Sequence, residues 1–225
     1  MYKNQKITAL IGSTQHNSTS KAMVDYLQQK FSNHDIKIDT YKACEVYQNE
    51  QKFTDLVTHI SQNSLFLICA PVYIDSLSYP LISTLEQIYS CKDDSIFHDK
   101  KLIAIIHSGF PEKIHRESAI EICYNFAKTM GFDWQGVVDF GVSSIIEGKP
   151  LKELGIASRW IRKSLDELVE KIVNKEKVSS GVIRKSLNLP IPLPIPIKWF
   201  PPILNFMINR KLKKEGVEDI LARPY

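Results

Sequence analysis

Residues 7–20 read Ile-Thr-Ala-Leu-Ile-Gly-Ser-Thr-Gln-His-Asn-Ser-Thr-Ser. A short apolar run of strand type ends at Gly12, a loop of hydroxyl and amide side chains follows, and a helix-like pattern then begins. In a strand–loop–helix arrangement, free backbone N–H groups and the positive end of the helix dipole face the loop and favour an anion. The loop therefore indicates a phosphate site built from neutral donors, with the candidate ligands Ser13, Thr14, Gln15, Asn17, Ser18 and Thr19.

Two familiar nucleotide-binding loops are excluded at this position. No Gly-Lys-Ser/Thr follows the strand, so the loop is not a Walker loop, and its only glycine is Gly12, so it is not a dinucleotide fingerprint. The alternative to phosphate binding is a serine-rich turn in which Ser18 or Ser20 caps the following helix. This stretch alone leaves both interpretations open.

The periodicity of the chain predicts an α/β fold. Two strand candidates, 65–70 and 102–106, are continuously apolar, as strands buried on both faces of a parallel sheet must be. Five strands alternating with five helices indicate a doubly wound five-stranded parallel sheet with helices on both faces, for which we expect the strand order 2-1-3-4-5. Strands are expected over 6–12, 35–40, 64–70, 101–107 and 135–140, and helices over 19–31, 51–62, 79–90, 113–130 and 157–174.

In such a sheet, ligands bind outside the carboxyl ends of the strands, so the loops after residues 12, 70 and 107 are expected to hold the functional residues. The second loop is apolar and aromatic, which suits a flat heteroaromatic ligand, although Tyr73 and Leu77 could instead pack under the next helix. In the third loop, Gly109 permits close backbone approach. His107 and His115 are read as structural rather than catalytic. The candidate ring-binding residues are Pro71, Val72, Tyr73, Ile74, Asp75, Ser76, Leu77, Ser108, Gly109 and Phe110.

Composition narrows the functional classes. The chain has 225 residues, an apolar fraction of 44% and a formal charge of +4, much of which lies near its C-terminus. We therefore expect no nucleic-acid partner for the main domain. The four cysteines, at positions 44, 69, 91 and 123, have no metal-binding spacing, so no metal site is expected. With no signal-like leader and no long apolar run, a cytoplasmic setting is expected.

The C-terminal part of the sequence differs from the rest. Residues 187–202 alternate proline with leucine and isoleucine, which favours an extended polyproline geometry. Apolar residues then accompany Arg210, Lys211, Lys213 and Lys214. This basic amphipathic segment suggests a peripheral membrane contact through residues 197–214, or packing on a partner subunit or on the chain's own sheet.

Together, the three loops resemble one family. Gly12-Ser13-Thr14 followed by Asn17-Ser18-Thr19-Ser20 resembles the phosphate loop of the flavodoxin-like NAD(P)H-dependent FMN reductases, and Pro71-Val72-Tyr73 with Asp75-Ser76-Leu77 resembles their isoalloxazine loop. Gly109-Phe110-Pro111-Glu112 with His115, followed by Gly136 and Gly148-Lys149-Pro150-Leu151, is similar to a subgroup of bacterial NAD(P)H oxidoreductases. The resemblance covers roughly residues 5–175.

The resemblance implies a flavodoxin-like FMN-binding domain over residues 1–178, followed by a C-terminal extension over residues 179–225. It implies hydride transfer from NAD(P)H to FMN and on to a quinone-like or other small acceptor, with a homodimer expected. No protein acid or base is expected to be essential, because the cofactor supplies the chemistry, while Tyr73 and Asp75 are candidates for tuning the ring. The alternatives are a flavodoxin-type electron carrier and a flavodoxin-fold binding module without catalysis.

Overall fold

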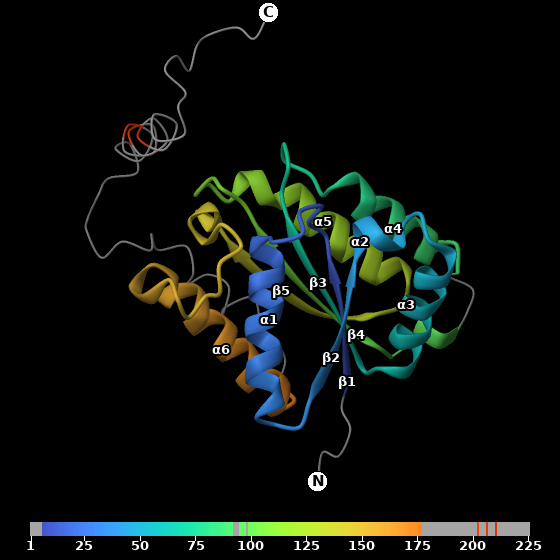
Figure 1. The fold of residues 1–225 in the computed structure, drawn as a ribbon. Helices are drawn as coiled ribbons and strands as arrows, with labels where there is room; N and C mark the ends of the chain where they lie inside the picture. Colours follow the sequence, from blue (N-terminus) through green and yellow to red (C-terminus); the bar gives the residue numbers. More distant parts are fainter. Residues whose placement is uncertain are drawn as a thin grey trace, which may run out of the picture. The chain divides into compact units, whose positions relative to one another are not determined.

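The computed structural model describes residues 6–91, 95–97 and 99–176, together with Pro202, Phe206 and Arg210. Its centre is a five-stranded sheet in the order β2-β1-β3-β4-β5, and all four neighbouring pairs are parallel (Figure 1). This confirms the expected α/β fold and strand order. The strands are β1 (Lys6–Ile11), β2 (Lys37–Lys42), β3 (Leu65–Pro71), β4 (Lys101–His107) and β5 (Asp133–Phe140).

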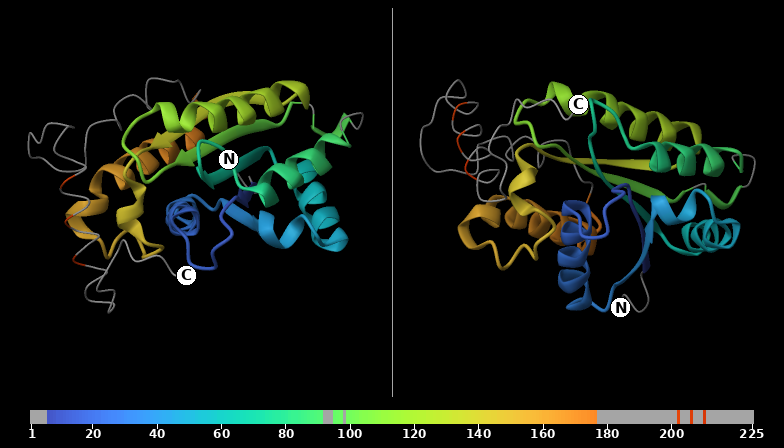
Figure 2. Two further views of the ribbon diagram at one scale, coloured as in Figure 1. Left: turned by 90° about the horizontal axis from the view of Figure 1, so that it is seen from above. Right: turned by 45° about the horizontal axis from the view of Figure 1, so that its top comes forward.

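Helices cover both faces of the sheet (Figure 2). One face packs against α1 and α6, and the other packs against α2, α3, α4 and α5. Short 3-10 turns, η1, η2 and η3, complete the described part. The bounds are α1 (Thr19–Ser32), α2 (Ala43–Val46), α3 (Glu50–Gln62), α4 (Tyr79–Tyr89), η1 (Ser95–Phe97), α5 (Ile114–Thr129), η2 (Ser143–Ile146), η3 (Gly155–Ser158) and α6 (Arg159–Val173).

The two apolar cores follow from the alternation of side chains along the central strands. In β3, Leu65, Leu67 and Cys69 enter the core under α1 and α6, whereas Phe66 and Ile68 enter the opposite core. Successive strand side chains point to opposite faces, so a strand buried on both sides must be apolar at every position. Cys69 and Cys123 are buried and form no disulfide, and their thiols pack as small core residues.

The structure corrects several expected boundaries. The short helix α2 was not predicted, because four residues are too few to show a helical period. Strand β2 begins at Lys37 rather than at residue 35, because Asp35 has φ +57° and ends the preceding turn. Helix α5 begins at Ile114, one residue later than expected.

Because every strand runs in the same direction, the carboxyl ends of β1, β3 and β4 lie at one edge of the sheet, the upper edge in Figure 1. The loops that follow Ile11, Pro71 and His107 therefore lie along the same edge. Gly12 starts the first loop against β3, where its N–H donates to the carbonyl of Cys69 at 2.9 Å.

The chain separates into two compact units, Met1–Pro190 and Ile191–Tyr225. In the second unit, Pro202, Phe206 and Arg210 have helical geometry and are exposed. Apart from these three, the proline-rich stretch and the segment 197–214 lie outside the described residues, as does the expected domain boundary at residue 178. No helix in the described part of the chain has the length and apolar character needed to cross a bilayer.

Candidate functional site

The first loop forms a capped helix start. Ser18 is the N-cap of α1, and its hydroxyl oxygen accepts the N–H of Lys21 at 3.1 Å. Ser20, the other capping candidate, is turned inward instead, and its hydroxyl contacts His107. At the start of the loop, the Ser13 hydroxyl accepts the N–H of Gln15 at 3.3 Å. Ser18 is therefore the residue that fixes the first turn of α1.

The backbone donors of this loop have few protein partners. Among the described residues, no group accepts the N–H of Thr14 or those of residues 16–20. Ser18 and Ser20 are buried, so their amides cannot all be satisfied by bulk water. The loop thus gathers free donors at the N-terminus of a 14-residue helix, which is the arrangement an anion needs.

The second loop is a two-residue hairpin turn. The N–H of Tyr73 donates to the carbonyl of Ser76 at 2.8 Å, and the N–H of Ser76 donates back at 3.2 Å. Between them, Ile74 and Asp75 both have positive φ, +48° and +60°, as a type I′ turn requires. Ile74 is completely exposed and Tyr73 is 43% exposed. The turn therefore presents an apolar tip at the edge of the sheet.

Other residues of the second loop face the protein. Leu77 is buried in the core that α4 covers, so the packing alternative holds for its side chain. The Ser78 hydroxyl donates to the carbonyl of Gly12 at 2.6 Å, which ties the second loop to the first. Pro71 continues β3 as its last residue, and the N–H of Val72 donates to the carbonyl of His107 at 2.8 Å.

The third loop follows β4, and hydrogen bonds of Ser108 fix its first residues. The N–H of Ser108 donates to the carbonyl of Phe140, and the Ser108 hydroxyl donates to the carbonyl of Phe110 at 2.8 Å. Ser108 is buried, whereas Gly109 and Phe110 are exposed. The loop therefore reaches the surface through Gly109 and through the ring of Phe110, while the side chain of Ser108 stays inside.

The second and third loops meet through His115. Its Nδ1 lies 2.7 Å from Oδ1 of Asp75, and its ring lies 5.1 Å from the ring of Phe110, centre to centre. His115 belongs to the first turn of α5, so this contact joins the turn after β3 to the loop after β4. The sequence singled out all three residues but gave no sign that they touch.

His107 is a buried structural residue. Its Nε2 lies 2.8 Å from the Ser20 hydroxyl and its Nδ1 lies 2.9 Å from the Ser143 hydroxyl. Ser143 donates its own proton to the carbonyl of Ser108, so Nδ1 of the imidazole must carry the hydrogen and Nε2 must accept from Ser20. Burial, reinforced by the nearby charge of Arg116, lowers the pKa of His107 to about 3. The ring is therefore neutral at physiological pH.

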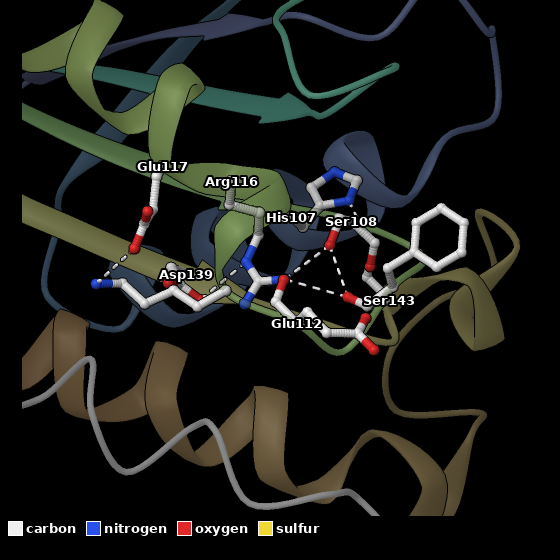
Figure 3. Close-up of polar contacts among 9 residues, drawn as sticks. His107, Ser108, Glu112, Arg116, Glu117, Asp139 and Ser143 are labelled. Atoms are coloured by element: carbon white, nitrogen blue, oxygen red, sulfur yellow. Dashed lines mark hydrogen bonds and ion pairs between the residues drawn. The ribbon is translucent and has the colours of Figure 1, made fainter. Parts of the chain in front are cut away.

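Beneath the third loop lies a buried ion pair that the sequence did not predict (Figure 3). Nε of Arg116 lies 3.1 Å from Oδ1 of Asp139, and both side chains are almost completely buried. Burial raises the pKa of the Asp139 carboxyl, and the guanidinium opposes that rise. Within a helix, an arginine ordinarily indicates a solvated face, so no local signal distinguishes Arg116.

Solved structures with the same fold are distant in sequence. An NADH:FMN oxidoreductase in its apo form is 15% identical, with a TM-score of 0.60 over 85% of this chain and 98% of its own. A putative quinone reductase from Klebsiella pneumoniae is 8% identical, with a TM-score of 0.57 over 77% and 87%. An FMN-dependent NADH-azoreductase from Bacillus anthracis, in complex with FMN, is 12% identical, with a TM-score of 0.54 over 76% and 100%. At these identities, the likeness shows a shared flavodoxin-like fold.

The family is shown by the sequence itself. No curated protein matches the chain. The model of the NADPH-dependent FMN reductase family matches residues 5–126, a span that runs from β1 into α5 and contains all three loops of the candidate site. The chain therefore belongs to the NADPH-dependent FMN reductase family, and it is an NAD(P)H-dependent flavin oxidoreductase whose cofactor is FMN.

Proposed function

We propose that this enzyme holds FMN across the loops after β1, β3 and β4 and uses it to reduce a quinone-like or other small acceptor with NAD(P)H. The observation that carries the proposal is the meeting of two complementary surfaces at one edge of the sheet. Free backbone donors gather at the start of α1, and exposed apolar side chains gather on the next two loops. A flavin mononucleotide has the matching parts, an anionic phosphate and a flat ring.

The first loop fits a phosphate group by its donor set. Its free N–H groups and the N-terminus of α1 supply directed hydrogen bonds and a positive potential, without an arginine or lysine in the loop. Gly148 packs so closely on this loop that an added Cβ would lie 2.8 Å from the carbonyl oxygen of Asn17, which fixes the loop from outside. The proposed phosphate ligands are Ser13, Thr14, Gln15, Asn17, Ser18 and Thr19.

The second and third loops supply the walls for the ring. Tyr73 and Phe110 offer exposed aromatic faces, and Asp75 contacts His115, whose ring lies beside that of Phe110. Leu77 and Ser108 would contact the ring through their backbone atoms, because the Leu77 side chain packs in the core and the Ser108 hydroxyl donates to the Phe110 carbonyl. The proposed ring contacts are Pro71, Val72, Tyr73, Ile74, Asp75, Ser76, Leu77, Ser108, Gly109 and Phe110.

Bound FMN supplies the hydride chemistry between the nicotinamide and the acceptor. The protein's part is to bind, orient and exclude water. His107 is buried, its Nε2 accepts from Ser20 and its Nδ1 proton is donated to Ser143, so neither ring nitrogen is free to exchange a proton with a substrate. We accordingly propose no essential acid or base, with Tyr73 and Asp75 in tuning roles. A flat quinone suits the exposed aromatic surface because aromatic rings favour stacking partners.

The test begins with the visible spectrum of the purified protein, with and without added FMN. Flavin absorbance that persists through gel filtration, followed by steady oxidation of NAD(P)H with a benzoquinone as acceptor, is the expected result. Cytochrome c, a one-electron acceptor, serves as the control that would instead indicate an electron carrier. Protein that neither retains FMN nor quenches its fluorescence would contradict the proposal and favour a binding module.

Tyr73→Ala tests the ring wall separately, with Tyr124→Ala on the exposed surface of α5 as the matched control. We expect weaker FMN binding or slower acceptor reduction in the first variant only. A Tyr73→Ala protein with wild-type binding and turnover would remove Tyr73 from the site. The expected homodimer stays a prediction, and light scattering on the eluting protein tests it directly.

A further inference from the structure

The third loop depends on one buried side chain. Nη1 of Arg116 lies 2.8 Å from the Ser108 hydroxyl, 3.0 Å from the carbonyl of Glu112 and 3.1 Å from the carbonyl of Phe110 (Figure 3). One guanidinium nitrogen therefore meets three acceptors spread over residues 108–112. Arg116 is 0% exposed and lies on α5, one turn after the loop it contacts.

The Ser108 end of the loop is also tied to β5 and to Ser143, because the Ser108 N–H donates to the Phe140 carbonyl and the Ser143 N–H and hydroxyl donate to the Ser108 carbonyl; beyond Ser108, the described part of the chain offers fewer bonds. The amides of Gly109 and Phe110 donate to no described group, and the only hydrogen bond inside the loop joins the Ser108 hydroxyl to Phe110. A segment with a glycine and exposed neighbours would sample several conformations if it were left alone. Hydrogen bonds from a charged group are about twice as strong as neutral ones, so Arg116 is the main hydrogen-bonding constraint on the described loop beyond Ser108.

The ion pair with Asp139 explains how a guanidinium can be buried there. Asp139 accepts from Nε, which leaves Nη1 to the loop and aims it there. Buried ion pairs of this kind contribute little net stability, since desolvation offsets most of their attraction. The buried pair of Arg116 and Asp139 is therefore better explained by its effect on the geometry of the loop than by a contribution to the stability of the fold.

We infer that Arg116 is a positioning residue for the ring half of the FMN site, holding the carbonyls of the third loop inward so that its free amides face the flavin. This inference rests on the proposed placement of the ring beside Gly109 and Phe110. The phosphate half is built separately by the Ser18 cap and the first turn of α1. Arg116 should consequently affect the ring and the phosphate to different degrees.

The test compares FMN with riboflavin, which lacks the phosphate. The main variant is Arg116→Met/Asp139→Asn, which removes both charges together and so avoids an unpaired buried charge. Arg116→Lys keeps the charge but loses the planar fork. Arg162→Lys is the matched control, because Arg162 also bonds a serine hydroxyl and a backbone carbonyl, but on α6.

In fluorescence titrations, we expect the double variant to raise Kd for FMN and for riboflavin by the same factor, about tenfold or more, with Arg116→Lys intermediate and Arg162→Lys unchanged. Ser18→Ala should raise Kd for FMN alone. The visible circular dichroism of bound flavin should also change in the Arg116 variants. A folded double variant with wild-type Kd for both ligands, or with a change for FMN only, would overturn the inference.

A second readout does not require flavin. The NMR backbone order parameters of Gly109, Phe110 and Glu112 should be lower in the double variant than in the wild type, while those of α1 keep their values. If the wild-type protein bound no FMN, the proposed function would fail, yet this measurement would still decide whether Arg116 fixes the loop. Unchanged order parameters at these three residues would show that it does not.

Discussion

The buried imidazole of His107 predicts a specific weakness toward acid. Replacing it by glutamine removes the titrating group while keeping a side chain that can donate to one serine and accept from the other. In the folded protein, burial and the charge of Arg116 lower the pKa of His107 to about 3, compared with 6.5 for the free side chain. Between these two values the unfolded chain binds more protons than the folded one. The free energy of unfolding therefore falls as the pH falls through this window.

The magnitude follows from linkage. Each pH unit inside the window costs about 1.4 kcal/mol, and the full shift of 3.5 units corresponds to about 5 kcal/mol. Between pH 7.5 and pH 4.5, titration of this one group should lower the free energy of unfolding by about 2.7 kcal/mol. Carboxyl groups also titrate in this range, but they do so in the wild type and the variant alike.

Urea unfolding of the wild type and His107→Gln at pH 7.5, 6.5, 5.5 and 4.5 measures the difference. The wild type should lose about 2.7 kcal/mol more than the variant over this range. His34→Gln, which changes an exposed histidine, should follow the wild type. The reasoning would be refuted if the wild type and His107→Gln lost stability in parallel as the pH falls. A parallel loss would mean that His107 has the same pKa in the folded and the unfolded protein.

Three further predictions concern packing, thiols and backbone strain. Gly12→Ala would place a Cβ 2.6 Å from Leu81 and 2.8 Å from Ala70, so urea unfolding should show that the free energy of unfolding falls by about 1–3 kcal/mol. In Gly109→Ala, the added Cβ would meet nothing closer than 3.8 Å, so the stability of this control should be nearly unchanged. Burial raises the pKa of Cys69 and of Cys123 to about 12, so a thiol reagent should leave both cysteines unmodified in the native protein. In denaturant, the same reagent should react with all four cysteines. Reaction of all four thiols in the native protein would contradict the burial of Cys69 and Cys123. Ile74→Asn should raise the free energy of unfolding by about 1 kcal/mol, because asparagine tolerates the positive φ that strains isoleucine. Ile156 is also exposed but has no positive φ, so Ile156→Asn should give no such increase in stability.

The fold could be predicted from the sequence because its main determinants are local or nearly so. Continuously apolar strands such as 65–70 require burial on both faces, and helices between them require parallel crossovers. The errors lie where tertiary structure decides. Strand β5 begins two residues earlier than expected, and the pairing with β4 shifts register beside Leu102, an irregularity that no periodicity reveals.

The site was predictable as a set of loops but not as a set of contacts. Parallel strands bring the loops after Ile11, Pro71 and His107 to one edge, so their positions in the sequence were sufficient to identify them. The direction of each side chain was not available in the same way. Ser108 and Ser20 turn inward, and Arg116 is buried only because Asp139 lies on β5, 23 residues away in the sequence. Such pairings depend on the completed fold.

The parallel order of the sheet has a consequence for how the chain can assemble during synthesis. Strand β1 pairs with β2 on one side and with β3 on the other, and the second pairing joins Ile7 to Leu65. A nascent chain that ends within α3 therefore carries β1 with one open edge, which is a template for association with other chains. Once β3 has been made, growth proceeds outward through β4 to β5, and β1 is never an edge again. A fragment ending at residue 62 should thus self-associate, although the complete sheet covers the same strand on both sides.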